Sequence, residues 1–170
     1  VHMALVSGRE PIDGVLIVSL PCPDRRFRSV AKDHPPAGRL ERAIVELHGL
    51  VAVGAPDQRP WLDHNRWGLT QPLGRGTKVE PTGQTYAFLS AEGAPLHQIP
   101  VGPVHAGIIE PGHFRFTANG ETVVRLEERL GYVHKGIEQL LRNMPIEQAA
   151  KVAGRISGDS TVAYGWAFAS

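Results

Sequence analysis

The chain has 170 residues, a formal net charge of +1 and a mixed distribution of acidic and basic side chains. This length allows one good hydrophobic core or two small ones. The near-neutral charge excludes the basic field that nucleic-acid binding requires. The single cysteine, Cys22, cannot form an internal disulfide, and no run approaches the roughly 20 apolar residues of a membrane span. We therefore expect a soluble, cytoplasmic protein.

The first half of the chain predicts one strand, one helix and a long connection. Residues 14–20 are an apolar, β-branched run bounded by Gly and Pro, which is typical of a buried strand. Residues 39–48 place aliphatic side chains at helical spacing, and Gly49 follows in the position that ends a helix. Residues 51–81 are rich in Pro, Gly and charge, and a loop of this length indicates a functional segment or a domain boundary.

The second half predicts an antiparallel hairpin. Residues 104–110 and 113–117 are expected to be extended, and the Asn-Gly pair at 119–120 is a strong turn signal. Residues 122–127 then return as the partner strand. Residues 85–89 have the composition of another strand.

Helical periodicity dominates the last part of the chain. A helix is expected near His134 and is interrupted at residues 144–145, where Pro145 can begin a second helix. Residues 161–170 form an apolar helix without Gly, Lys or Pro to end it, so we expect a fragment of a longer polypeptide. Residues 1–3 have the character of a cloning remainder and are not expected to carry structure.

Three motifs carry the most specific signal. Residues 102–113 read Gly-Pro-Val-His-Ala-Gly-Ile-Ile-Glu-Pro-Gly-His, residues 132–138 read Tyr-Val-His-Lys-Gly-Ile-Glu, and residues 155–160 read Arg-Ile-Ser-Gly-Asp-Ser. Together they resemble the start of the large-subunit fold that nickel–iron hydrogenases share with the quinone-site subunit of respiratory complex I. Their joint order is more specific than any one of them.

The first half also carries a resemblance. Residues 40–50 and 54–60 are similar to the signature of the small hydrophilic complex I subunit that adjoins the quinone-site subunit. Both signatures on one chain resemble the fused large subunits of formate hydrogenlyase and related membrane-bound hydrogenases. The resemblance implies an α+β fold in two parts. Residues 1–78 would be the end of a small-subunit-like α/β domain plus a linker, and residues 79–170 the hairpin and helices that begin a large-subunit-like domain.

His105, Glu110 and His113 flank a turn that contains Pro111 and Gly112. They can be surface side chains of a bent strand, or zinc ligands, although their spacing matches no strong zinc pattern. The family resemblance implies a third role, because the second histidine of the complex I turn lies at the quinone headgroup. That role falls on His113, whose imidazole can donate a hydrogen bond or proton to a reduced quinone oxygen. His105 and Glu110 are weaker candidates for cofactor binding.

Residues 155–160 resemble the first hydrogenase metal motif, Arg-x-Cys-Gly-x-Cys, with Ser157 and Ser160 in place of both cysteines. A nickel–iron centre takes four thiolates, and a serine hydroxyl cannot replace a thiolate at neutral pH. We therefore expect no metal ligands here and no nickel–iron centre, and Arg155 remains a weak cofactor-binding candidate. Independently of the family, Ser157 or Asp159 is expected to cap the last helix.

Tyr164 has two interpretations of equal standing. It can be a buried aromatic residue of the last helix, packed beside Trp166 and Phe168. Residues 163–164, Ala-Tyr, also resemble the pair on the complex I helix that faces the quinone, where the tyrosine hydroxyl binds the headgroup. Tyr164 and His113 are therefore the two candidates for a quinone-type pocket.

The resemblance implies an oxidoreductase component of a membrane-associated electron-transfer complex. Its partners would be an iron–sulfur small subunit and a membrane module, which would hold the chain on the cytoplasmic face of the membrane. No cofactor is expected within the chain itself, and a quinone is possible in the parent complex. The alternative is a structural assembly module without chemistry. Under either hypothesis the isolated chain is expected to be inactive and able to self-associate through exposed apolar helix faces.

Overall fold

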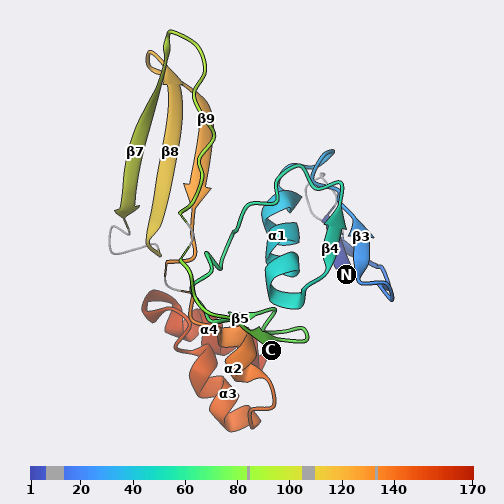
Figure 1. The fold of residues 1–170 in the computed structure, drawn as a ribbon. Helices are drawn as coiled ribbons and strands as arrows, with labels where there is room; N and C mark the ends of the chain where they lie inside the picture. The colour runs from blue at the N-terminus through green and yellow to red at the C-terminus, as the bar shows by residue number, and fades with distance from the viewer. Residues whose placement is uncertain (7–13, 84, 105–109, 133) are drawn as a thin grey trace.

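The computed structural model describes residues 1–6, 14–83, 85–104, 110–132 and 134–170. The described residues combine helices with small, mostly antiparallel sheets, as an α+β fold requires. A three-stranded sheet projects from one end, the C-terminal helices lie at the opposite end, and a helix with short strands lies to one side (Figure 1).

The N-terminal residues form a two-stranded antiparallel sheet. Strand β1 (His2–Val6) pairs with β2 (Val15–Ser19), so the expected strand is present, while the expectation that residues 1–3 carry no structure is wrong. The prediction of a buried strand is also wrong, because both faces of this pair are exposed. Leu16 is 63% exposed and its partner Leu5 is 44% exposed.

A helix and a parallel strand pair form the second element group. Helix α1 (Ala37–His48) packs against β4 (Val51–Val53), which pairs with β3 (Arg26–Arg28) in parallel. Gly49 ends α1 with φ of 69°, a left-handed conformation that favours glycine, so the predicted helix end is confirmed. The centre of each strand, Phe27 or Ala52, is buried.

A carboxylate, rather than a leucine, is the buried side chain of α1. Glu41 is 5% exposed, and its two oxygens accept the hydroxyl of Ser29 at 2.6 Å and the backbone N–H of Val30 at 2.7 Å. These bonds compensate for the burial of the charge. Leu40, one of the aliphatic residues at helical spacing in the predicted helix, is 63% exposed.

The largest sheet is formed by β7 (Leu96–Val104), β8 (Gly112–Asn119) and β9 (Thr122–Arg129). The order is β7-β8-β9 and all pairs are antiparallel. The predicted hairpin is therefore confirmed, with Gly120 at φ of 58° in its turn. The predicted extension over residues 104–110 overlaps the end of β7 and otherwise lies largely outside the described residues.

The two faces of this sheet have opposite chemistry. The strand register places one apolar row, Ile99–Phe116–Leu126, across the three strands, and a neighbouring polar row, Pro100–Arg115–Glu127, on the other face. The polar face is the more covered one, since Glu127 is 6% exposed while Leu126 is 49% exposed.

Residues 85–89 do not form the expected strand. Their backbone groups bind side chains instead of a neighbouring strand. The N–H of Leu89 donates to Glu127 at 3.1 Å, and the carbonyl of Ala87 accepts from Arg59 at 3.1 Å. The segment thus lies along the polar face of the sheet without joining it.

The C-terminal part contains α2 (Ile137–Leu141), α3 (Ile146–Ala153), a short 3-10 turn (Gly158–Ser160) and α4 (Thr161–Ala169). The predicted helices are present, and Pro145 directly precedes α3. Of the two predicted caps, Ser157 makes no side-chain capping bond and Asp159 lies inside the 3-10 turn; Ser160, which directly precedes α4, makes no capping bond either. The 3-10 turn replaces that cap.

Two further short strands, β5 (Leu69–Thr70) and β6 (Thr77–Lys78), lie in the connecting segment.

Candidate functional site

A hollow of about 540 Å³ lies where the sheet passes into the C-terminal helices. Most of its walls are apolar side chains that come from segments far apart in the sequence. They include Leu62, Leu130, Tyr132, Ile137, Ile156 and Tyr164. We call this site the Tyr164 hollow. Its volume is within the range of about 300–1,000 Å³ that small-molecule sites occupy.

Helix α4 brings Tyr164 to the hollow, where the side chain is partly accessible. Glu110 lies at the same hollow and faces Lys135, with 3.5 Å between the carboxylate oxygen and Nζ. Lys135 also donates to the carbonyl of Ile156 at 2.7 Å. The structure therefore brings together two of the predicted site residues, Tyr164 and Glu110, and adds a lysine that the sequence did not single out.

His113 lies on β8 and is not among the residues that line the Tyr164 hollow. Its Nδ1 is 3.3 Å from the carbonyl oxygen of Gly102, and its Nε2 is 3.4 Å from Nε of Arg115. Its ring also contacts Phe88, with 5.0 Å between the ring centroids. The second predicted histidine, His105, lies outside the described residues. A shared His113–Tyr164 pocket stays a prediction.

Residues 155–160, which resemble the hydrogenase metal motif with serines in place of its cysteines, follow α3. Arg155 is exposed there and is not among the hollow-lining residues. Ser157 and Ser160 are joined through their backbones, since the N–H of Ser160 donates to the carbonyl of Ser157 at 3.2 Å. Hydroxyl groups are not the soft anionic ligands that a nickel–iron centre takes, so these residues do not fit such a centre. Within the described ranges, no group of three or more His, Cys, Asp or Glu is arranged to hold a metal ion.

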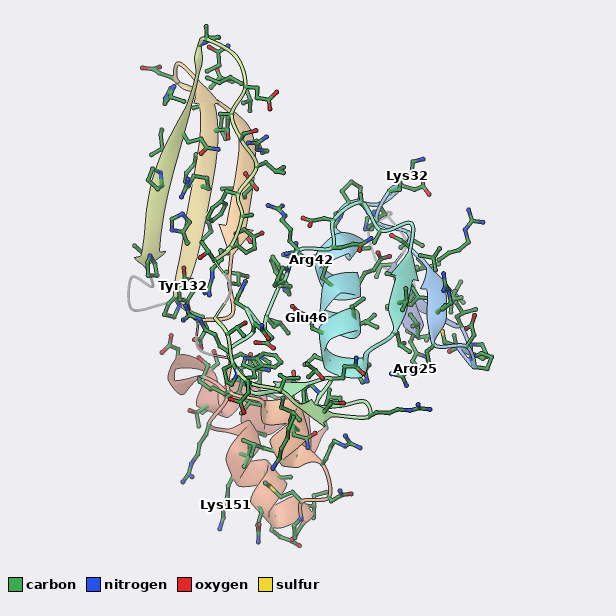
Figure 2. All side chains as sticks on the ribbon, in the orientation of Figure 1. Arg25, Lys32, Arg42, Glu46, Tyr132 and Lys151 are labelled. Carbon is green, nitrogen blue, oxygen red and sulfur yellow. The ribbon has the colours of Figure 1, made fainter. Side chains whose placement is uncertain are left out.

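An ion-pair network joins the α1 region to the polar face of the sheet. Arg59, in the connecting segment, is 2.8 Å from Asp57 and 2.7 Å from Glu127 of β9. Arg42 of α1 reaches Asp57 at 3.4 Å, and Arg125 reaches the second oxygen of Glu127 at 3.2 Å. Figure 2 shows Arg42 on the side of α1 that faces the connecting segment. We call these five residues the Arg59 network.

The network affects the pKa values of Asp57 and Arg59. Burial alone would raise the pKa of Asp57, but hydrogen bonds from Arg59 and the positive charge of Arg42 bring that pKa below its ordinary value. The pKa of Arg59 is raised, chiefly by the hydrogen bond to Asp57. Both groups therefore remain charged at neutral pH. The sequence signal for this network was the Arg-x-Glu-x-Arg alternation on β9, which places three charges on one face of a strand.

Two further contacts tie the connecting segment to its neighbours. Glu46 of α1 accepts the backbone N–H groups of Trp61 and Leu62 at 3.0 and 2.7 Å, while burial raises the pKa of Glu46. His64 is 2% exposed, and its Nε2 is 3.0 Å from the carbonyl oxygen of Leu130. The contact between His64 and Leu130 holds together two segments that each contribute a residue, Leu62 or Leu130, to the Tyr164 hollow.

A helix capable of spanning a bilayer would need more length and apolar character than any helix in the described part of the chain has.

The sequence of this chain matches those of known proteins. The chain is homologous to the large subunits of hydrogenases and to the fused NADH-quinone oxidoreductase subunits that resemble them. No protein-family model matches it.

Three relatives define this relationship. Hydrogenase-4 component G of Escherichia coli is 36% identical over 79% of this chain and 26% of its own length, and formate hydrogenlyase subunit 5 of the same organism is 31% identical over 84% and 27%. The C/D subunit of NADH-quinone oxidoreductase from Bacteroides fragilis is 24% identical over 68% and 26%. The chain spans about a quarter of the length of these curated relatives. The resemblance predicted from the sequence motifs is confirmed.

Proposed function

We propose that this chain is part of an electron-transfer component of a membrane-associated complex, and that its Tyr164 hollow takes a quinone-type ligand where hydrogenases hold nickel and iron. The observation that carries the proposal is the juxtaposition at one hollow of Tyr164, Glu110 and Ile156, the last of which belongs to the serine-bearing segment. The names of the relatives support the class, since they cover both hydrogenases and NADH-quinone oxidoreductases.

The chemistry of the hollow suits a neutral aromatic ligand with polar oxygens. Apolar walls bind the ring, and the hydroxyl of Tyr164 can donate to a quinone oxygen. Lys135 offers a second donor and is held in place by Glu110 and by the carbonyl of Ile156. In this arrangement the protein binds and orients the ligand and places proton donors at its oxygens.

A binding experiment tests this site. We expect Tyr164→Phe to weaken binding of a short-chain benzoquinone by about fivefold, because a hydrogen bond contributes roughly 1 kcal/mol and each 1.4 kcal/mol is tenfold. Tyr86→Phe is the matched control, since Tyr86 lies outside the hollow lining and loses the same hydroxyl. Titration calorimetry measures the affinity of both variants for the benzoquinone. Equal affinities would count against a quinone site at Tyr164.

The absence of nickel–iron chemistry is proposed on the donor set alone. Ser157 and Ser160 replace the first thiolate pair that the hydrogenase motif requires. Metal analysis of the purified complex that contains this chain is the test. Stoichiometric nickel would overturn this part of the proposal.

The proposed partners are an iron–sulfur subunit and a membrane module, which would place the chain on the cytoplasmic face of the membrane. The homologues named for multi-subunit enzymes support this assignment. Cell fractionation tests it: the chain should sediment with membranes, and it should remain in the supernatant when the membrane module is deleted. Sedimentation without that module would contradict the attachment.

A structural assembly module is the second candidate. Helix α4 is apolar on all sides, yet Val162 is 79% exposed and Trp166 is 75% exposed, as expected for a docking element. The variants His113→Ala and Tyr164→Phe in the assembled complex distinguish the two functions. Unchanged electron transfer in both would favour the structural role, and a loss in Tyr164→Phe would favour the ligand site.

A further inference from the structure

Arg129, a buried cation without an ion-pair partner among the described residues, lies next to Leu130, which lines the Tyr164 hollow. Arg129, at the end of β9, is 7% exposed, and its guanidinium carbon lies 3.8 Å from the centroid of the Tyr132 ring. Its Nη1 is buried without a hydrogen-bond partner among the described residues. A guanidinium stays charged at any physiological pH, and burying it without an acceptor is costly.

Glu127, two residues before Arg129 on the same strand face, already pairs with two other arginines, and its second oxygen has no hydrogen-bond partner among the described residues. Glu127 accepts from Arg59 and Leu89 through one oxygen and faces Arg125 through the other. The interaction of Arg129 with the Tyr132 ring face supplies attraction to π electrons but no hydrogen-bond acceptor for Nη1. A negative charge from outside the described residues would complete this site.

His64 presents a second unsatisfied atom to the same region. Its Nε2 faces the carbonyl of Leu130, so this nitrogen carries the hydrogen and Nδ1 is left buried without a partner among the described residues. Burial and the charge of Arg129 lower the pKa of His64, so the ring is neutral at neutral pH. An anion beside it would reverse that preference, because a protonated ring could donate from Nδ1.

Tyr132 connects Arg129 with the hollow, because its ring lies against the guanidinium and it also lines the hollow, whereas Arg129 and His64 themselves are not among the lining residues. Leu130 and Tyr132, which flank the position between Arg129 and the helices, line the Tyr164 hollow, and Tyr132 is 37% exposed. Figure 2 shows Tyr132 at the base of the three-stranded sheet, next to the helical part. A ligand with an apolar body and an anionic end would place its body against the hollow walls and its charge behind Tyr132.

We propose that Arg129 and His64 form a binding site for the carboxylate or phosphate end of an amphiphilic anion that occupies the Tyr164 hollow. The anion would compete with the proposed quinone-type ligand for the Tyr164 hollow, but the two proposals can fail separately, because Tyr164→Phe tests the first ligand and Arg129→Gln tests the anion. Guanidinium groups bind carboxylates and phosphates through paired N–H donors, which makes Arg129 the anchor.

Titration calorimetry of the full chain with three probes tests the charge and the source of the anion. Octanoate should bind, octan-1-ol should bind at least tenfold more weakly, and inorganic phosphate should show whether the headgroup suffices. Phosphate affinity equal to that of octanoate would overturn the amphiphilic assignment. Arg129→Gln should weaken octanoate binding by about tenfold, since the anchoring bonds are charge-assisted. Arg28→Gln, an exposed arginine of β3, is the matched control and should bind like the unaltered chain.

Proton uptake gives a readout that does not depend on the folding of an Arg129 variant. The charged and titratable groups near His64 are Arg129 of β9, Tyr86 of the segment 85–89, and Asp63 and Arg66 of the segment that carries His64. Octanoate binding at pH 7 should take up a proton, seen as a binding heat that depends on the ionisation enthalpy of the buffer, and His64→Gln should abolish this dependence. Binding without proton uptake, or octanoate affinity unchanged by Arg129→Gln, would overturn the proposal.

Discussion

Uncoupling Arg59 from Glu127 should destabilise the chain far more than an ordinary surface ion pair would. The two atoms are 2.7 Å apart, and the Glu127 side chain is 5% exposed while that of Arg59 is 26% exposed. Exposed pairs contribute about 0.2–1 kcal/mol, and removal of one partner of a buried pair costs about 3–5 kcal/mol. Because one partner is buried and the other is partly screened, we expect a coupling free energy of about 2 kcal/mol.

A double-mutant cycle measures this coupling. The variants are Arg59→Met, Glu127→Gln and the double variant, and the free energies of unfolding come from urea titration. The matched control is the cycle Lys135→Met with Glu110→Gln, an exposed pair at 3.5 Å, for which we expect less than about 1 kcal/mol. A coupling for Arg59 and Glu127 no larger than that of the control pair would refute the reasoning.

Two further predictions concern the joint at the Tyr164 hollow. Gly131→Ala should lower the free energy of unfolding, measured by urea titration, by more than about 1 kcal/mol, because φ is 81° and the new Cβ would meet the carbonyl oxygen of Leu62. Gly158 faces open space, so the control variant Gly158→Ala should change this free energy very little. The pKa of His64 is below its usual value of 6.5 in the folded chain, so the unfolded chain binds more protons and stability should fall as pH decreases below about 6.5. His64→Gln should flatten that part of the pH profile of unfolding, and parallel profiles would show that another group is responsible.

The elements that follow local rules could be predicted from the sequence. Helix α1 has an apolar periodicity and a glycine at its end, and the β8–β9 hairpin has an Asn-Gly turn between alternating strands. Each signal acts over a few residues, so no distant contact is needed to interpret it.

Strand β7 was missed because it contains Pro100 and Pro103, which argue against a strand. The structure explains the exception. Strand β7 is at the edge of its sheet, where a missing N–H can face away from the ladder without loss. For residues 85–89 the error is the opposite one, since a strand was predicted and none forms. The composition of the segment is strand-like, but its backbone groups bind the side chains of Arg59 and Glu127 instead of a neighbouring strand.

The residues around the candidate site also include some that were predicted from the sequence and some that were missed. Tyr164 and Glu110 were predicted through family motifs, and the structure places both at the hollow, while their roles stay a prediction. Arg59 and His64 were missed, because their importance depends on partners that lie 66 to 68 residues away in the sequence. Arg129 was missed for a related reason, since only its burial reveals an unsatisfied cation.

The sheet whose apolar face is the exposed one has a thermodynamic consequence. The row Ile99–Phe116–Leu126 leaves hydrocarbon in contact with hydration water, since Ile99 is 44% exposed and Leu126 is 49% exposed. Any protein surface that covers the row releases this water, so the association should show a heat capacity that becomes more negative with the area covered. A protein that binds to this face can therefore be recognised by a binding enthalpy that decreases with temperature, whatever the value of the enthalpy at any one temperature.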